Sequence, residues 1–295
     1  MLENRRIAQI IKSQPVLEGA GVHLKRVFGF GNTDLFDPFL LLDDFRSDNP
    51  VYYTKGFPWH PHRGIETITY VIDGQVEHSD SLGNSGIISS GDIQWMTAGS
   101  GIVHQEMPTG DENGRMGGFQ LWANLPASHK MTQPRYRDFT HEQIPEVVLG
   151  NGVSIKILCG KAHGKEGPVQ DVFIDPAYLD IQVPEGQVFK YPTQQGHTVF
   201  AYVIEGQGNF GSQTTKSKDS GQNTETSAMI SNETLVLFSD GDQVVVSTRN
   251  DAVRFLLISG KPIREPVAWQ GPIVMNTQEE LQLAFEEYQA GTFIK

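Results

Sequence analysis

The feature that most constrains the fold is an internal repeat. Residues 70–75 read YVIDGQ and residues 202–207 read YVIEGQ. In each copy, apolar β-formers lead into an acidic residue and a glycine, which predicts a strand entering a hairpin. A second similarity follows in both halves, where a Gly-Asp turn precedes a predicted strand: Ser90-Gly91-Asp92 precedes IQWM, and Asp240-Gly241-Asp242 precedes QVVVS. The chain is therefore predicted to contain a duplicated β-domain.

The two halves of this repeat differ in length. A polar stretch with several prolines, residues 126–146, indicates a boundary, and we assign residues 1–135 and 136–295 to the two domains. The two glycine turns are 17 residues apart in the first half (Gly74 to Gly91) and 35 apart in the second (Gly206 to Gly241). The extra length coincides with residues 211–228, which are polar and lack aromatic residues. We expect them to form an exposed, mobile hairpin extension.

The end of the chain has the pattern of a short helix. Thr277 and Glu280 form a capping box, and Leu281, Ala284, Phe285 and Tyr288 fall on one face. Gly291 is placed to end the helix.

Composition and charge limit the kinds of binding partner and the cellular compartment that we expect for this chain. The formal net charge of −12 argues against direct binding to nucleic acid or to an anionic membrane. The N-terminus lacks the apolar core of a secretory signal, and no run approaches the ~20 apolar residues of a membrane span. Cys159 is the single cysteine, so no intramolecular disulfide can form, and we read it as a buried strand residue. We expect a cytoplasmic protein, or a nuclear one if the source is eukaryotic.

Two histidines two residues apart are the first candidate metal ligands. His60 and His62 project to the same face if the backbone is extended, with Cα atoms about 6.6 Å apart. That spacing suits two imidazoles that converge on one ion. Pro61 between them cannot donate a ladder hydrogen bond, which predicts an edge strand or a strand start.

A second pair repeats this spacing about 40 residues later. His104 and Glu106 are also two apart, and we expect their strand to face the His60 strand across a small β-barrel. Three imidazoles and one carboxylate suit Fe(II), Mn(II), Ni(II), Cu(II) or Zn(II) better than Ca²⁺ or Mg²⁺. Glu66 competes with Glu106 for the role of carboxylate ligand, because it shares the face of His60 and His62 on an unbroken strand. Otherwise Glu66 is a hydrogen-bonding partner of the ligands.

The residues around these candidates predict a pocket and a core. Phe57 and Trp59 flank the ligands and are candidates to line an apolar pocket, whereas we expect Trp95 and Met96 in the core. The other histidines form no pair at ligand spacing and are read as structural or surface residues: His23, His78, His129, His141, His163 and His197. In the second repeat, the positions that align with the ligands hold Pro192, Gln194, Arg254 and Leu256, so we predict a second barrel without metal ligands.

The chain resembles the pirins, which are bicupin proteins of the cupin superfamily. The similar segments are DPFLLLDDF (37–45), GFPWHPHRGIET (56–67), GDIQWMTAGSGIVHQEMP (91–108) and KPIREPVAWQGPIVMNT (261–277). The resemblance implies an all-β fold of two cupin β-barrels in tandem with a short C-terminal helix. It also maps the family's ligands onto His60, His62, His104 and Glu106, which favours Glu106 over Glu66.

The resemblance implies two different functions. Some pirins resemble quercetin 2,3-dioxygenases, which open a flavonol ring with O2, and this implies one bound metal ion, first of all Fe(II), with Mn, Ni, Co, Cu or Zn as alternatives. In this reading a hydroxyl proton of the flavonol passes to Glu106, or to Glu66 if it is free, as general base. Other pirins act as metal-dependent or redox-dependent protein partners of transcription factors or metabolic enzymes, with no chemical reaction.

Overall fold

The computed structural model describes residues 2–216 and 223–295, and the chain divides into two compact units. Residues Gln14–Gln143 and Ile263–Lys295 form one unit, here called the first barrel. Residues Met1–Ser13 and Ile144–Pro262 form the other, here called the second barrel. The predicted domains, 1–135 and 136–295, were contiguous, so the structure differs from them at both chain ends. The N-terminal segment packs with residues 144–262, and the C-terminal segment packs with residues 14–143.

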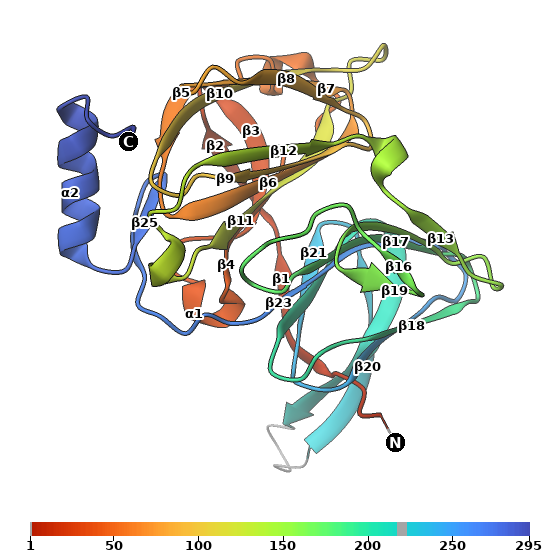
Figure 1. Ribbon diagram of the computed structural model, residues 1–295. Helices are drawn as coiled ribbons and strands as arrows, with labels where there is room; N and C mark the ends of the chain where they lie inside the picture. Colours follow the sequence, from red (N-terminus) through yellow and green to blue (C-terminus); the bar gives the residue numbers. More distant parts are fainter. Residues whose placement is uncertain (1, 217–222) are drawn as a thin grey trace. The chain divides into compact units, whose positions relative to one another are not determined.

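The first barrel is a sandwich of two antiparallel sheets (Figure 1). The larger sheet has the order β12-β9-β6-β11-β4-β3-β2, and the smaller sheet has the order β5-β10-β7-β8. Burial alternates along β10, as expected for a strand with one face in a core. The strands of the larger sheet are β2 (Gln14–Glu18), β3 (Val22–Phe28), β4 (Phe39–Asp44), β6 (Ile65–Asp73), β9 (Ile93–Thr97), β11 (Gly117–Asn124) and β12 (Arg135–Phe139). Those of the smaller sheet are β5 (Phe57–His62), β7 (Gln75–Asp80), β8 (Ser85–Ser89) and β10 (Ile102–Thr109).

The acidic-glycine turn of the first repeat does not form the predicted hairpin. β6 pairs with β9 and β11, whereas β7 pairs with β8 and β10. Gly74, at φ +76°, therefore stands at a corner where the chain leaves one sheet and enters the other. The turn residues were correctly identified from the sequence, but the pairing inferred from them was wrong, because a turn fixes the local chain reversal and not the strand that each arm meets.

The second barrel is built on one ten-stranded sheet with a core of aliphatic and aromatic side chains. Its strands are β1 (Ile7–Lys12), β13 (Glu146–Val148), β14 (Ser154–Cys159), β17 (Ala177–Val183), β18 (Val188–Pro192), β19 (Thr198–Lys216), β20 (Asn223–Ser231), β21 (Thr234–Phe238), β22 (Gln243–Ser247) and β23 (Val253–Gly260), with a separate pair β15 (Lys161–Ala162) and β16 (Lys165–Glu166). Cys159 is buried in β14, as predicted.

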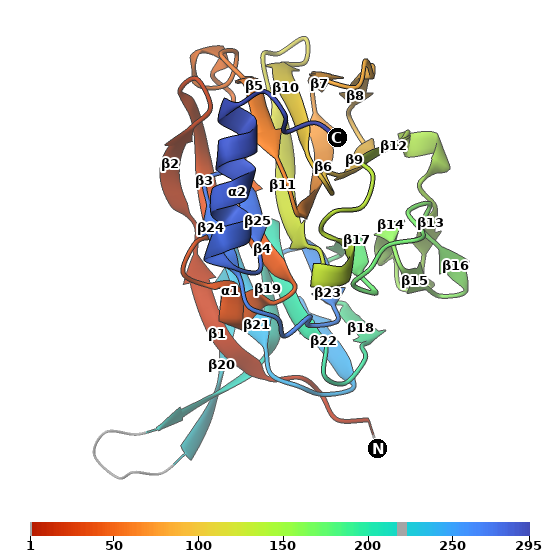
Figure 2. The ribbon, with the colours of Figure 1, turned by 60° about the vertical axis from the view of Figure 1, so that its left-hand side comes forward.

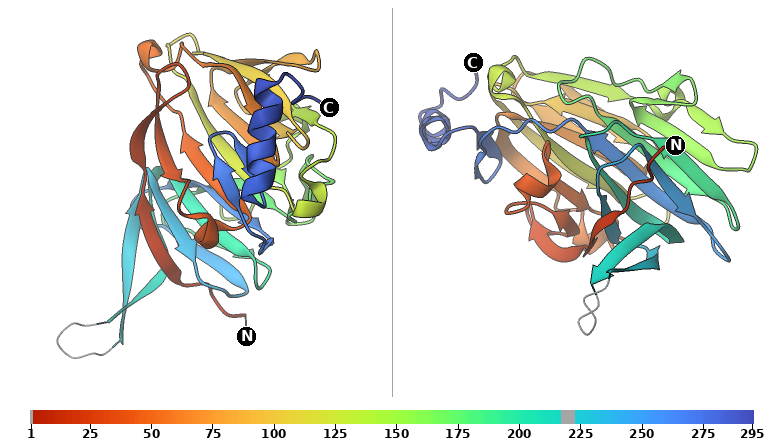
Figure 3. Two further views of the ribbon diagram at one scale, coloured as in Figure 1. Left: turned by 90° about the vertical axis from the view of Figure 1, so that its left-hand side faces the viewer. Right: turned by 90° about the horizontal axis from the view of Figure 1, so that it is seen from below.

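The second copy of the repeat lies inside one long strand. β19 continues through Glu205 and Gly206, where its register with β23 shifts, so the acidic-glycine pair forms an irregularity and not a turn. The described part of segment 211–228 forms the arms of a hairpin, since β19 pairs with β20 as far as Lys216 opposite Asn223 (Figure 3). The predicted mobility falls on residues 217–222, which lie outside the described residues.

The C-terminal residues complete the first barrel. Residues 263–275, here called the closing segment, include the paired strands β24 (Ala268–Gln270) and β25 (Ile273–Met275). The helix α2 (Gln278–Gln289) lies beside them (Figure 2), with Leu281 and Ala284 buried. The capping box of Thr277 and Glu280 is present, which confirms the predicted start of this helix.

Short helical turns complete the chain: α1 (Thr33–Phe36), and the 3-10 turns η1 (Pro50–Tyr52), η2 (Ala127–His129) and η3 (His141–Gln143). Across the described ranges, every helix falls short of the length and apolar character that crossing a membrane requires.

Candidate metal centre

The two predicted ligand strands are hydrogen-bonded neighbours in the smaller sheet of the first barrel. β5 pairs antiparallel with β10, and His104 lies opposite His60. Our expectation that these strands face each other across the barrel was therefore wrong. β5 is the edge strand of this sheet, as Pro61 predicted. Register between the strands shifts after His104, at a bulge of the kind that redirects side chains near functional sites.

Three imidazoles converge at this pairing. Nε2 of His60 lies 3.1 Å from Nε2 of His62, and one nitrogen from each of His60, His62 and His104 falls within a group spanning less than 4.8 Å. The ring centroids are 4.4–5.0 Å apart. Two nitrogens bonded to one ion at about 2.0–2.1 Å lie roughly 3 Å apart, so this arrangement has the spacing of a metal site.

The outer nitrogen of each ring is held by a different part of the first barrel. Nδ1 of His60 lies 2.8 Å from the carbonyl oxygen of Pro58, and Nδ1 of His62 lies 3.1 Å from that of Pro272. A carbonyl can only accept, so each Nδ1 carries the ring proton and each Nε2 presents a lone pair. Two lone pairs 3.1 Å apart repel each other unless a cation lies between them.

The third ring supports the same conclusion. Nδ1 of His104 lies 3.1 Å from the hydroxyl of Tyr136, and its Nε2 is buried without a hydrogen-bond partner. An unpaired buried nitrogen is costly in the absence of a ligand. Burial, with a contribution from the neighbouring imidazoles, lowers the pKa of His62 and His104 well below the ordinary range. Neutral rings with inward lone pairs are what a transition metal requires.

Glu106 lies beside the histidines but outside the group of three. It is buried on the same face of β10 as His104, because Gln105 and Met107 alternate with them. Burial raises the pKa of Glu106, and the neighbouring His60 partly lowers it again. The hydroxyl of Thr69 lies 3.4 Å from Oε1 of Glu106. A carboxylate in this position can serve as a fourth ligand or accept a proton from a bound molecule.

Glu66 is placed differently from the expectation. β5 ends at His62 and β6 begins at Ile65, so the unbroken strand that put Glu66 on the face of the histidines does not exist. Glu66 and Thr69 are three residues apart in β6 and project to opposite faces, and Thr69 faces Glu106. Oε1 of Glu66 instead accepts a hydrogen bond from Thr97 and lies 3.7 Å from Arg137.

His60, His62 and Glu106 line a cavity of about 770 Å³ within the first barrel. Phe57 and Trp59 line it, as predicted, and Trp59 is half exposed at 52%. Trp95 and Met96 are fully buried, as expected of core residues. The remaining aromatic side chains of the lining are Phe30, Phe45, Tyr53, Trp122 and Trp269.

Sequence reasoning missed the residues that support the site from a distance. Pro272, Trp269 and Tyr136 carry no local pattern that links them to His60 or His104. His78, read as structural or surface, is a buried residue of β7 opposite Glu106; its ring stacks on Tyr136, and its Nε2 lies 3.1 Å from Asp138. The one clue in the sequence was the similarity of residues 261–277 to the pirin C-terminus.

In the second barrel, the positions aligned with the ligands have structural roles. Arg254 pairs with Asp180 at 2.6 Å, Leu256 is buried, and Pro192 ends β18.

Comparisons with known proteins agree with this architecture. The Pirin family model matches residues 21–123, and the model of the Pirin C-terminal cupin domain matches residues 178–294. A pirin-like protein of Caulobacter vibrioides is 42% identical, over 98% of this chain and 99% of its own. A Pseudomonas aeruginosa protein named "Putative quercetin 2,3-dioxygenase" is 39% identical, over 99% of each chain. The crystal structure of quercetin 2,3-dioxygenase from Acinetobacter baumannii is similar with a TM-score of 0.84 and 28% identity, over 98% of each chain.

Proposed function

Because the chain belongs to the pirin family of bicupin proteins, we propose that it is a mononuclear, metal-dependent dioxygenase that acts on a flavonol-like aromatic substrate. The observation that carries this proposal is the group of three inward-facing imidazoles beside a cavity rich in aromatic side chains. The similarity to proteins named quercetin 2,3-dioxygenase supports the reaction class.

The proposed ligands are His60, His62, His104 and Glu106. Neutral imidazoles with one carboxylate suit Fe(II), our first choice, and also Mn, Ni, Co, Cu or Zn. When bound, such an ion supplies Lewis acidity toward a substrate oxygen and, if it is redox-active, the electron exchange with O2 that side chains cannot supply.

The side chains of the cavity bind and orient the substrate. Phe57, Trp59 and Trp122 offer faces and edges against which a planar ring can pack. Glu106 is the group that would accept the proton of a substrate hydroxyl, since it is buried beside the imidazoles and burial raises its pKa toward the working range of a general base.

The test is flavonol bleaching by protein loaded anaerobically with each candidate metal and then exposed to O2, with oxygen consumption measured in parallel. His62→Ala should lose both bleaching and bound metal. His23→Ala is the matched control, because His23 lies on the first barrel outside the cavity lining and stacks on Tyr52; it should retain both. Absence of bleaching with every metal would refute the enzymatic role and leave a metal-dependent interaction with a protein partner.

A further inference from the structure

One wall of the cavity carries an ion network that the proposed reaction does not use. Nε and NH2 of Arg26 donate to the two oxygens of Asp43 at 2.9 and 2.8 Å, and NH1 lies 2.9 Å from Oε1 of Glu18. All three residues line the cavity. They come from β2, β3 and β4 of the larger sheet, whereas the histidines come from the smaller sheet.

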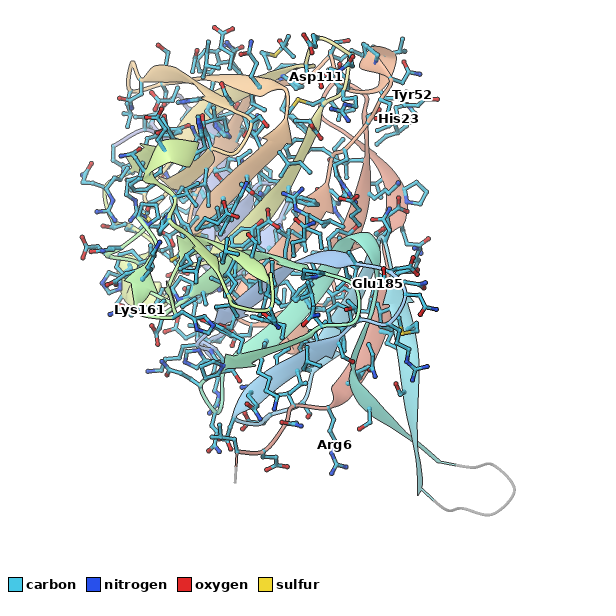
Figure 4. The ribbon with its side chains drawn as sticks, turned by 90° about the vertical axis from the view of Figure 1, so that its right-hand side faces the viewer. Arg6, His23, Tyr52, Asp111, Lys161 and Glu185 are labelled. Carbon is cyan, nitrogen blue, oxygen red and sulfur yellow. The ribbon has the colours of Figure 1, made fainter. Side chains whose placement is uncertain are left out.

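The alternation of side chains along the strand places this network on the face that lines the cavity. Val22, Leu24 and Arg26 alternate along β3 and line the cavity. His23 points outward, where it lies beside Tyr52 with the rings 4.3 Å apart (Figure 4). The side chain of Asp43 is 7% exposed, so its charge interacts with a ligand through little water.

The charges of this network do not cancel. Two carboxylates face one guanidinium, which leaves a formal charge of −1. Asp43 accepts both of its Arg26 hydrogen bonds with one lone pair on each oxygen, and each oxygen has a second lone pair to offer. The wall therefore presents acceptors and negative charge to a molecule in the cavity. The metal end has the opposite polarity once a divalent ion sits among three neutral imidazoles and Glu106.

We propose that Glu18 and Asp43, held in place by Arg26, are specificity-determining residues. They select a substrate whose outer ring is uncharged and carries hydrogen-bond donors such as phenolic hydroxyls, and they exclude one whose outer ring carries a carboxylate or sulfonate. The identity of the ring system in this inference rests on the proposed function. The selectivity against an anionic outer ring rests on the charges of the wall itself.

Binding of matched probes to the metal-loaded protein tests the inference. The first pair is quercetin and quercetin-5′-sulfonate, and binding is read from quenching of the tryptophans, since Trp59, Trp122 and Trp269 line the cavity. Two like charges about 6 Å apart at an effective dielectric constant of about 20 weaken binding roughly 100-fold. We expect wild-type protein to bind the sulfonate about 30- to 100-fold more weakly than the parent flavonol.

Three isosteric variants assign the effect to this wall. Asp43→Asn and Glu18→Gln should each reduce the discrimination severalfold and bring the affinity for the sulfonate toward that for the parent. Asp44→Asn is the matched control: Asp44 is the neighbouring residue and forms a similar pair with Arg46, at 2.6 Å, but it does not line the cavity. It should retain the full discrimination. If Asp43→Asn fails to fold, Glu18→Gln alone tests the role of the wall. The side chain of Glu18 is 41% exposed, so its replacement should leave the fold intact.

The outcomes separate this inference from the proposed function. Equal binding of both probes by wild-type protein, or unchanged discrimination in Asp43→Asn and Glu18→Gln, would overturn the role of the wall. A second pair, catechol and catechol-4-sulfonate, makes the same comparison without a flavonol. Discrimination between the catechols with no flavonol binding or bleaching would refute the proposed function and keep the inference; no discrimination in either pair would overturn the inference.

Discussion

Replacing Gly64 with alanine should loosen the closing segment from the strand that carries His62. Gly64 adopts φ +78°, and a Cβ at this position would lie 2.0 Å from the carbonyl oxygen of Val274. Ordinary contacts begin at 3.4 Å, so this carbonyl would have to move by about 1.4 Å. Val274 cannot move freely, because its N–H donates to Arg63 at 3.1 Å and its oxygen accepts from the buried Lys130 at 3.0 Å.

The magnitude follows from these contacts. A left-handed backbone costs an alanine about 1–2 kcal/mol, and loss of the two hydrogen bonds of Val274 costs about 1 kcal/mol each. The free energy of unfolding of the first barrel should fall by about 3–4 kcal/mol. Pro272 is two residues from Val274, and its carbonyl would also leave Nδ1 of His62. Loss of such an outer partner weakens metal binding by roughly 10-fold.

Urea unfolding and metal titration of the same protein measure both effects. Gly83→Ala is the matched control, because Gly83 has φ +86° and an added Cβ there would meet no atom within 4 Å. It should lose about 1–2 kcal/mol from backbone strain and keep the affinity for metal. Equal losses of stability in the two variants would refute the contact with Val274 as the cause, and unchanged metal affinity in Gly64→Ala would refute the coupling to His62.

Two further changes test the surroundings of the site. Tyr136→Phe removes the hydroxyl next to Nδ1 of His104 and should weaken metal binding about 10- to 100-fold in a competition titration; Tyr191→Phe, which loses a comparable 2.8 Å hydrogen bond in the second barrel, should not. Burial raises the pKa of Asp43 from 3.8 to about 6, so between these values the folded protein holds a proton that the unfolded chain releases. Stability should therefore fall by about 3 kcal/mol as the pH rises through this window, and Asp43→Asn should flatten that part of the unfolding profile; an unchanged slope would contradict the burial argument.

The class of fold was predictable because it depends on local signals. Apolar β-formers before glycine turns predicted strands, and the Thr277–Glu280 pair predicted the start of α2, which the structure confirms. The resemblance to pirins is confirmed by the family models. The exchange of chain ends between the barrels was not predictable, since β1 pairs with β21 across more than 200 residues. Long-range pairing of this kind is decided by the packing of the whole barrel.

The candidate ligands were predictable for a similar reason. A spacing of two residues on a strand fixes the shared face of His60 with His62 and of His104 with Glu106. Glu66 shows where this reasoning stops, because the strand breaks at Arg63 and Gly64 and the face reverses. Gly64 had no visible role in the sequence; in the structure it has a positive φ, and its Cα lies so close to the carbonyl of Val274 that a side chain would not fit.

The candidate metal centre is assembled from segments that lie far apart in the chain. β5 and β10 supply the imidazoles, β12 supplies Tyr136, and the closing segment supplies the carbonyl of Pro272, 210 residues from His62. This carbonyl fixes the His62 tautomer only when the closing segment is docked beside Arg63 and Lys130. Docking of the segment therefore favours the metal-binding form of His62, and by linkage a bound metal must stabilise the docked segment by the same free energy. Strand β5 and the closing segment are thus coupled through His62.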